Sequence, residues 1–321
     1  MKFGLVYDDL LEHQLATPLL DKKGQDTLWE TVFYEPVRTE ALYRSLTYIY
    51  VMLKNEGDFS SQEHLGVDRI DYCSFGNSNP FRIRIVNKFN DNYDYFYIKT
   101  ADASRVYGLE LEHLLSPNRI SYYVDGNTLI EEHIAGIPGD MFISTMMLTK
   151  HTNKVRLAKE FVKFNERCFV RLLGDMRSYN YVLDITPDFD DVQYRIRAID
   201  FDQQCYEGRK NLYLPQYFKE NYPLVELGME LINDRTVKQY QAEERSLIAR
   251  RLIASRYRVK DLIDCMEEDE ISTPEKVKQL REDLAKHHGN PGFLELDNMG
   301  EILKLQLKAT LAQHIRKVRN I

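Results

Sequence analysis

The feature that most constrains the fold is a set of short segments with strand-like alternation between residues 68 and 99. Residues 81–86 place three apolar side chains on one face and two arginines on the other, as in a half-buried strand. Residues 68–75 and 95–99 show similar patterns, and turn clusters at 76–80 and 90–92 separate the three segments. The sequence therefore predicts an antiparallel meander of three strands.

A helix and a second pair of strands follow this meander. Residues 104–115 are predicted to be helical, because a capping residue precedes them and Pro117 lies beyond their end. Residues 120–124 and 128–134 alternate and are joined at Asp125-Gly126-Asn127, a hairpin signal. The predicted order is thus three strands, one helix and two strands.

The rest of the chain is mostly helical in pattern. A long helix is expected at about 154–172, a strand pair at 181–185 and 194–199, and helices from about Leu224 onward. We therefore predict an α+β protein of three parts. These are an N-terminal extension, partly helical, over residues 1–66, a small sheet-containing part over 67–135, and a helical part over 136–321.

Composition excludes several classes of protein. The net charge of -7 and the pI near 5.7 argue against a general nucleic-acid binder, which needs a basic face. The four cysteines form no C-x-x-C pair, so neither a zinc site nor a disulfide framework is expected. No segment approaches the roughly 18 apolar residues of a membrane span, and no signal peptide is apparent. The expectation is a cytoplasmic protein without a membrane partner.

Three polar residues stand out because of their positions relative to the predicted elements. Asp175 and Asn180 lie five residues apart in the loop that follows the long helix, and Asp200 ends the second strand of the pair after it. Phosphoryl transfer needs a carboxylate to orient an acceptor hydroxyl, and oxygen ligands for the magnesium ion that neutralises the phosphates. One loop and one strand end could supply both.

The pattern D-x-x-x-x-N followed by Ile-Asp-Phe resembles the catalytic and metal loops of the protein-kinase-like superfamily. Gly-Asp in place of His-Arg-Asp is closer to the aminoglycoside phosphotransferase and choline kinase branch, and HipA-like kinases are more distant relatives. The resemblance implies a bilobal kinase-like fold, with a small antiparallel-sheet N-lobe and a mainly helical C-lobe, and ATP and Mg²⁺ as cofactors. It makes Asp175 the catalytic base, and Asn180 and Asp200 metal ligands. Arg177 would balance the charge of the transferred phosphate, and Asp202 would assist at the metal or bond within its loop.

The same resemblance assigns residues of the N-lobe to the nucleotide. Lys99 ends the third strand, where the family places a phosphate-binding lysine, and Glu110 or Glu112 of the following helix would pair with it. We favour Glu110, whose neighbours Leu111 and Leu114 are expected to be buried. Gly76 falls in the loop expected to cover the phosphates. The backbone near Glu132 and Ile134 would bind adenine.

The chain also departs from the family pattern. It has no G-x-G-x-x-G, and no A-P-E follows Asp200, which counts against an ordinary eukaryotic-type protein kinase. The expected function is transfer of the ATP γ-phosphoryl group to a hydroxyl of a small molecule of unknown identity. The alternatives are a HipA-like protein Ser/Thr kinase and a nucleotide-binding pseudokinase that acts as a regulator. Protein partners and the role of residues 1–66 are left open.

Overall fold

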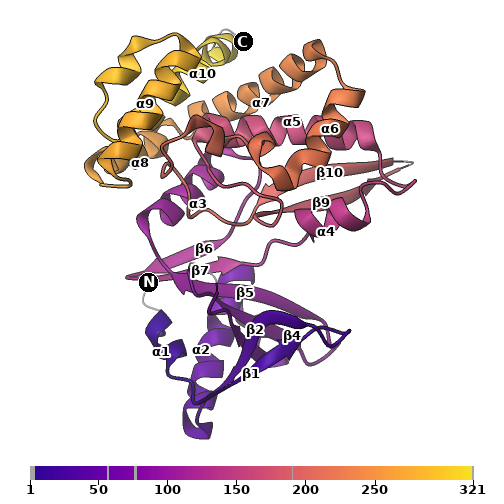
Figure 1. Cartoon of the computed structure of the whole chain (residues 1–321). Coiled ribbons are helices and arrows are strands. Elements are labelled where there is room, and N and C mark those ends of the chain that lie inside the picture. The colour runs from indigo at the N-terminus through magenta and orange to yellow at the C-terminus, as the bar shows by residue number, and fades with distance from the viewer. Residues whose placement is uncertain (1–3, 56–57, 76–77, 190, 320–321) are drawn as a thin grey trace. The chain divides into compact units, whose positions relative to one another are not determined.

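The computed structural model describes most of the chain (Figure 1), namely residues 4–55, 58–75, 78–189 and 191–319. Contacts between residues divide the chain into two compact units. Unit 1 comprises Met1–Asp102 and Ile120–His133, and unit 2 comprises Ala103–Arg119 and Ile134–Ile321.

These boundaries differ from the predicted ones in two respects. The segment predicted as an extension, residues 1–66, belongs to unit 1 together with the predicted meander. The helix after the meander, α3 (Ala103–Leu115), was placed with the sheet but is grouped with unit 2. The second strand pair returns to unit 1, so the chain passes between the units more than once.

Unit 1 is built on a seven-stranded antiparallel sheet in the order β1-β2-β3-β4-β5-β7-β6. The predicted alternation is observed in β4, where Phe81, Ile83 and Ile85 are buried and the arginines between them are not. Helix α2 packs against this apolar face through Leu46 and Ile49, both fully buried. The elements of unit 1 are α1 (Tyr7–Leu11), β1 (Leu15–Leu20), β2 (Asp26–Phe33), α2 (Pro36–Asn55), a 3₁₀ turn (Phe59–His64), β3 (Leu65–Tyr72), β4 (Phe81–Asn87), β5 (Tyr93–Thr100), β6 (Tyr122–Asp125) and β7 (Thr128–Glu132).

Strands β1 and β2 were not predicted. They pair with each other and, through Glu30 and Thr31, with β3. β1 is an edge strand, contains Pro18 and has no buried side chain, so it shows no alternation of apolar and polar residues. Its strand conformation depends on pairing with β2 rather than on a local pattern.

Unit 2 is mainly helical and has the long helix α5 at its centre, packed against α6, α7 and α10 (Figure 1). A small sheet in the order β10-β9-β8 completes it. Besides α3, its elements are β8 (Ile137–Pro138), α4 (Gly139–Thr145), α5 (Lys154–Arg171), β9 (Tyr181–Asp188), β10 (Asp191–Ala198), three short 3₁₀ turns (Lys210–Tyr213, Pro215–Tyr217, Lys219–Asn221), α6 (Tyr222–Leu231), α7 (Asp234–Ala254), α8 (Arg256–Glu268), α9 (Pro274–His288), a fourth 3₁₀ turn (Pro291–Glu295) and α10 (Met299–Arg319).

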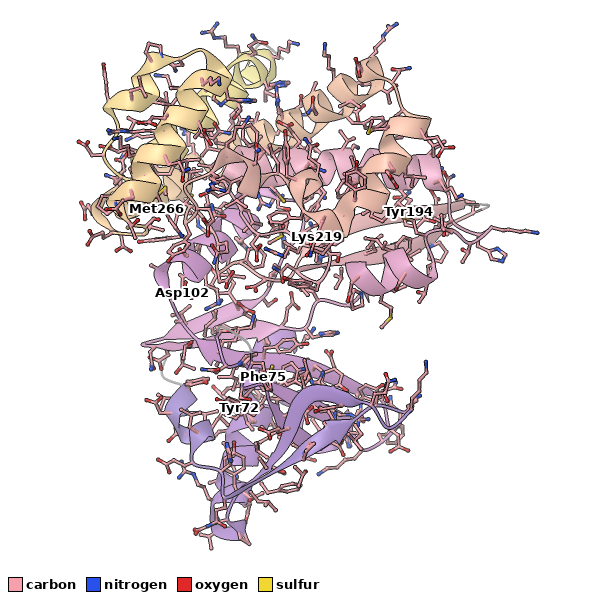
Figure 2. All side chains as sticks on the ribbon, in the orientation of Figure 1. Tyr72, Phe75, Asp102, Tyr194, Lys219 and Met266 are labelled. Carbon is pink, nitrogen blue, oxygen red and sulfur yellow. The ribbon has the colours of Figure 1, made fainter. Side chains whose placement is uncertain are left out.

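Each unit has its own hydrophobic core. Met266 of α8 is buried among side chains of α3, α9 and α10 in unit 2, whereas Tyr72 of β3 packs against the core of unit 1; both are labelled in Figure 2. The leucine stripe of α10 supplies Leu303, Leu307 and Leu311 to the unit 2 core. Burial of these apolar side chains is the main stabilising contribution to each unit.

The predicted fold class is confirmed. The protein is of the α+β class: an antiparallel sheet dominates the N-terminal part, and the C-terminal part is mainly helical. None of the helices in the described part of the chain combines the length and apolar character needed to cross a bilayer.

Candidate functional site

The loop that carries Asp175 begins where α5 ends. Leu172 adopts a left-handed backbone conformation with φ of 54°, which stops the helix. Its carbonyl accepts a hydrogen bond from the Cys205 N–H at 2.9 Å, and Leu173 forms a bridge with Gln204. The start of the loop is therefore fastened to the segment that follows Asp200, and this brings the two sequence motifs together.

Asp175 itself has a left-handed backbone, with φ of 53°. Such conformations are uncommon for residues other than glycine, although Asp tolerates them, and they concentrate at functional sites. The Asp175 N–H donates to the Leu212 carbonyl at 3.1 Å, which fixes the backbone. Its side chain remains 34% exposed, so the carboxylate is held in place but is accessible to a substrate.

Arg177 connects Asp175 to a carboxylate that the sequence analysis missed. Its Nε donates to Asp175 Oδ1 at 2.8 Å, and its Nη1 donates to Glu220 Oε1 at 3.2 Å. The hydrogen bond to Asp175 is the main reason that the pKa of Arg177 is raised above its ordinary value. Glu220 Oε2 is buried and has no hydrogen-bond partner among the described residues. No local motif marks Glu220, because the fold brings it here from a separate 3₁₀ turn.

Asn180 is oriented by Asp175. Its amide Nδ2 donates to the Asp175 carbonyl at 2.7 Å and, more weakly, to Asp175 Oδ2 at 3.3 Å. The Asn180 N–H also donates to the Arg177 carbonyl at 2.9 Å, which closes the turn. Because the amide nitrogen is engaged with Asp175, the side-chain oxygen Oδ1 faces away and is left as a free acceptor.

Asp200 reaches the same place through the β9–β10 hairpin. Tyr181, which starts β9, is opposite Ala198, which ends β10, and the Ile199 N–H donates to the Asn180 carbonyl at 3.0 Å. Asn180 and Asp200 therefore lie at one end of the hairpin. The Asp200 carboxylate makes only a weak contact, 3.4 Å from the Asp202 N–H to Oδ1.

The oxygen atoms of Asn180 and Asp200 are of the types that magnesium takes as ligands. No group of three or more His, Cys, Asp and Glu side chains within the described ranges is arranged to hold a metal. Magnesium does not need such a group, because it takes one or two carboxylates and completes its shell with water and substrate phosphates. One carboxylate from Asp200 and one amide oxygen from Asn180 match that preference.

Asp202, the third expected metal ligand, is engaged elsewhere. Its Oδ2 lies 3.6 Å from Nη2 of Arg105 in α3. Helix α3 can approach this segment closely because Gly108 has no side chain; a Cβ there would lie 2.8 Å from Phe201 Cβ. Of the two roles predicted for Asp202, the contact with Arg105 favours a structural one.

Lys99 lies in unit 1 and has a partner that was not predicted. Its Nζ is 2.6 Å from Oε2 of Glu131, and the two side chains are only 11% and 7% exposed. The register explains this pair: Lys99 is opposite Leu129, so Glu131, two residues further along β7, lies on the same face of the sheet. The alternation of side chains along a strand predicts that Glu131 and Glu132 lie on opposite faces of the sheet. Only the register of β5 and β7 shows that Glu131 is the one on the face of Lys99.

The two glutamates of α3 differ in burial. Glu112 is buried, and it forms an ion pair with Arg171 in which both side chains are 2% exposed. Glu110 is 30% exposed and lies 3.4 Å from Arg258. Its neighbours Leu111 and Leu114 are buried, as expected. Its pairing with Lys99, which belongs to the other unit, stays a prediction.

The two residues expected near adenine, Glu132 and Ile134, differ in their hydrogen bonds. The Glu132 N–H donates to the Ser121 carbonyl at 3.0 Å, and its carboxylate accepts from the Ser121 N–H at 2.8 Å. Ile134 is buried, and its backbone makes no hydrogen bond within the described ranges. Of these two positions, Ile134 is the one with free backbone groups. Gly76, expected to cover the phosphates, lies outside the described residues.

Comparisons with known proteins add little to this geometry. No family model matches the chain, and no curated protein matches it. One solved structure that matches is that of the Neurospora crassa PAN3 pseudokinase. It has 8% sequence identity and a TM-score of 0.21, and the match covers 89% of this chain and 72% of that one. An identity and a TM-score this low support no assignment of activity.

Proposed function

We propose that the chain is an ATP- and Mg²⁺-dependent phosphotransferase that moves the γ-phosphoryl group to a hydroxyl of a small molecule. The observation that supports this most directly is the convergence of Asp175, Asn180 and Asp200 within unit 2. Asp175 and Asn180 are joined by a 2.7 Å hydrogen bond, and Asn180 and Asp200 flank the same end of the β9–β10 hairpin. An accessible carboxylate beside two oxygen ligands is what this reaction requires.

In the proposed reaction Asp175 orients the acceptor hydroxyl and accepts its proton. Arg177 fixes the rotamer of Asp175 by binding Oδ1, so that Oδ2 is the oxygen presented to the acceptor. The weak contact of Oδ2 with Asn180, at 3.3 Å, leaves it able to accept a further hydrogen bond. The carboxylate is thus held in one orientation before the acceptor arrives, which lowers the entropic cost of the reaction.

Asn180 Oδ1 and Asp200 would hold the metal, and Mg²⁺ supplies charge neutralisation at the phosphates when it is bound. Lys99 is proposed to contact the α- and β-phosphates, assisted by Glu110, and the backbone of Ile134 to contact adenine. Glu132 is less suited to adenine, since its N–H is engaged with Ser121. Gly76 is proposed to cover the phosphates, and a metal role for Asp202 is retained only as the weaker alternative.

The acceptor is proposed to carry a positive charge. Glu220 stands beside Arg177 and has one carboxylate oxygen without a partner. An ammonium group on the acceptor could satisfy that oxygen while its hydroxyl reaches Asp175. Amino alcohols and aminoglycosides, the acceptors implied by the resemblance to the aminoglycoside phosphotransferase and choline kinase branch, have this character.

A second candidate is a nucleotide-binding pseudokinase that acts as a regulator. The observation in its favour is the pairing of both expected functional cations with carboxylates, Arg177 with Asp175 at 2.8 Å and Lys99 with Glu131 at 2.6 Å. In a protein that binds nucleotide without transferring phosphate, both ion pairs could stay formed. Radiolabelled ATP distinguishes the candidates, because only an enzyme labels an acceptor; label in protein instead of a metabolite would indicate a HipA-like kinase.

The first experiment is thermal unfolding with ATP, with and without Mg²⁺, on the wild type, on Asp200→Ala and on Asp261→Ala. Asp261 is a matched control, an exposed aspartate of α8. A ligand that binds only the native state stabilises it by about 2.7 kcal/mol at a hundred times its Kd. We expect a magnesium-dependent rise in Tm of several degrees for the wild type and Asp261→Ala, and none for Asp200→Ala. No rise in the wild type at millimolar ATP would refute both nucleotide-based proposals.

A further inference from the structure

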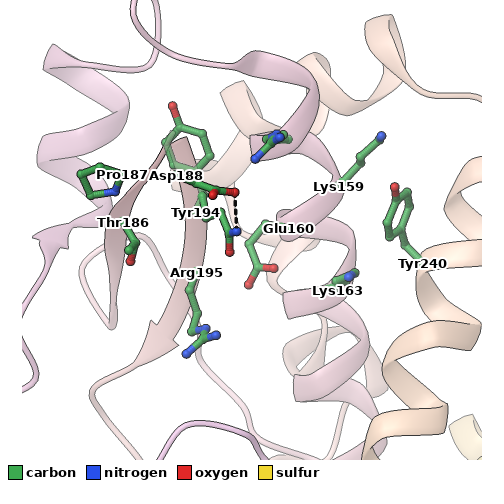
Figure 3. Close-up of a pocket in the computed structure, with 11 residues that line it drawn as sticks. Lys159, Glu160, Lys163, Thr186, Pro187, Asp188, Tyr194, Arg195 and Tyr240 are labelled. Carbon is green, nitrogen blue, oxygen red and sulfur yellow. Dashed lines mark hydrogen bonds between the residues drawn. The ribbon is translucent and has the colours of Figure 1, made fainter. Parts of the chain in front are cut away.

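A depression lies in unit 2. It has a volume of about 690 Å³ and is bordered by α5, the β9–β10 hairpin and α7. None of Asp175, Asn180 and Asp200 lines it. Figure 3 shows Lys159 and Lys163 on α5 between the hairpin and Tyr240. We call this depression the α5 groove; its lining residues are Arg156, Lys159, Glu160, Lys163, Thr186, Pro187, Asp188, Gln193, Tyr194, Arg195 and Tyr240.

The α5 groove is positively charged in a chain that is negative overall. Four cationic side chains line it against two carboxylates, whereas the whole chain has a net charge of -7. Both carboxylates serve the fold: Glu160 accepts from the Ile196 N–H at 3.0 Å, and Asp188 accepts from Gln193 at 2.8 Å.

The Arg195 side chain, by contrast, is exposed and makes no hydrogen bond or ion pair with the rest of the described chain. Lys163 lies 3.3 Å from Glu243 of α7. Of the cationic side chains that line the groove, Lys159 and Arg195 form no ion pair with a carboxylate of the described chain.

The cations form a row instead of converging on one point. Arg156, Lys159 and Lys163 follow each other at spacings of three and four residues, so they share one face of α5. From the helical rise, the row is about 10 Å long. A single phosphate would be best held by donors that converge on it. A row of this length instead suits a ligand with several negative charges along its length.

The aromatic side chains of the groove do not suit a nucleic acid. Single-stranded nucleic acids bind on open aromatic faces where bases can stack. The ring of Tyr240 has the ammonium groups of Lys159 and Lys163 at 5.2 and 5.0 Å from its centroid. Tyr194 is buried, and its hydroxyl accepts from the Asn153 N–H at 3.0 Å. Neither ring offers a free stacking surface.

We propose that the α5 groove is a docking site for an extended acidic peptide segment of a protein partner. In an extended chain, side chains on the same face recur every 6.6 to 7 Å, roughly. Lys159 and Lys163 are four residues apart on a helix, about 6 Å along its axis. Acidic side chains at alternate positions of such a peptide can therefore meet successive cations of the row.

A neighbouring depression extends the same surface. It shares Lys163 with the α5 groove and has a volume of about 530 Å³. Arg250 of α7 and Lys317 of α10 also line it, together with one carboxylate, that of Glu243. A peptide longer than the α5 groove could continue along this second basic stretch. The docking site is separate from the proposed phosphotransfer site, so it can be tested by binding alone, whether or not the chain is an enzyme.

The test is fluorescence anisotropy with the full chain and a fluorescein-labelled peptide that alternates Glu and Ser over about twelve residues, an extended design with its acids on one face. The comparison peptide has Gln in place of Glu. We expect the Glu peptide to bind, with an affinity that falls as salt is added, and the Gln peptide not to bind. Lys159→Gln/Lys163→Gln should weaken binding about tenfold, and Arg195→Gln by a smaller factor.

The matched control is Lys278→Gln/Lys286→Gln, which removes two exposed lysines from α9 and does not touch the groove. It should bind like the wild type. Arg195→Gln keeps the test valid if the double variant folds poorly, because the Arg195 side chain makes no hydrogen bond or ion pair in the described chain and the substitution leaves the strand backbone unchanged. The proposal is overturned if the wild type does not bind the Glu peptide, or if the groove and α9 variants weaken binding equally. It is also overturned if inorganic phosphate or a single-stranded oligonucleotide binds the groove in preference to the peptide.

Discussion

The Asp175 loop of unit 2 and the Lys99 strand pair of unit 1 each contain an ion pair, one exposed to solvent and one buried. Arg177 and Asp175 are 2.8 Å apart and 37% and 34% exposed, whereas Lys99 and Glu131 are 2.6 Å apart and 11% and 7% exposed. In the loop, solvent screens the Arg177–Asp175 pair, so either side chain can leave the other and bind a substrate at little cost in free energy. In the sheet, burial makes separation of the two charges costly. The distance between the charged atoms therefore does not show how costly it is to separate a pair. The exposed fraction of the two side chains does.

The sharpest test of this comparison is Asp175→Asn, which removes the proton acceptor and keeps the shape of the side chain. If Asp175 is the base, kcat should fall by roughly 10²- to 10⁴-fold, the range typical of general base catalysis. The Tm should change little, because the pair with Arg177 is exposed. Steady-state kinetics and thermal unfolding measure the two effects. Asp261→Asn serves as the control, and an unchanged kcat in Asp175→Asn would remove Asp175 from the mechanism.

The next largest effect is expected at Glu112 and Arg171, a fully buried pair that precedes the loop. Arg171→Leu leaves the buried carboxylate of Glu112 without its ion-pair partner and should cost about 3–5 kcal/mol of unfolding free energy. Arg258→Leu, which removes the exposed partner of Glu110, should cost less than about 1 kcal/mol. Urea unfolding measures both. Equal losses in the two variants would contradict the assignment of Glu112 as the structural glutamate of α3.

This pair also predicts a dependence on pH. Burial alone would raise the pKa of Glu112, but Arg171 and other partners outweigh it and hold the pKa below its ordinary value of 4.5. A lowered folded-state pKa gives stability that is present above pH 4.5 and is lost as the pH falls through the folded value. The stability gap between wild type and Arg171→Leu should therefore narrow below pH 4.5. If the difference in unfolding free energy between wild type and Arg171→Leu increased on acidification, the predicted direction of the Glu112 pKa shift would be wrong.

The smallest of the expected effects is that of Glu131→Gln, which tests whether the Lys99 pair is committed. A hydrogen bond to a charged group is worth about 1.5–3 kcal/mol, so the variant should lose roughly that much stability. Glu132→Gln is a suitable comparison on the opposite face of β7, where Lys54 lies 3.3 Å away. A Glu131→Gln variant as stable as the wild type would show that separating the Lys99–Glu131 pair is not costly.

The parts of the site that the sequence predicted are those held by short-range contacts. Asp175, Arg177 and Asn180 lie within six residues, and their mutual hydrogen bonds follow from one turn. The hairpin that carries Asp200 was also predicted, because its two strands alternate and are adjacent in the chain. Glu131 and Glu220 were missed, since the first depends on strand register and the second on the return of the chain after Asp200.

By itself, the sequence determined the α+β class, the order of elements from β3 to β10 apart from β8 and α4, and the loop with Asp175 and Asn180. Local periodicity, turn residues and helix ends specify such features over a few residues. Only the tertiary structure decided that β1 and β2 join the sheet and that Glu112 is the buried glutamate of α3. It also decided which carboxylates neutralise Lys99 and Arg177. All of these features depend on contacts between segments that are distant in the sequence. The energy of such a contact is set by burial and strand register, and neither burial nor register can be read from a single position.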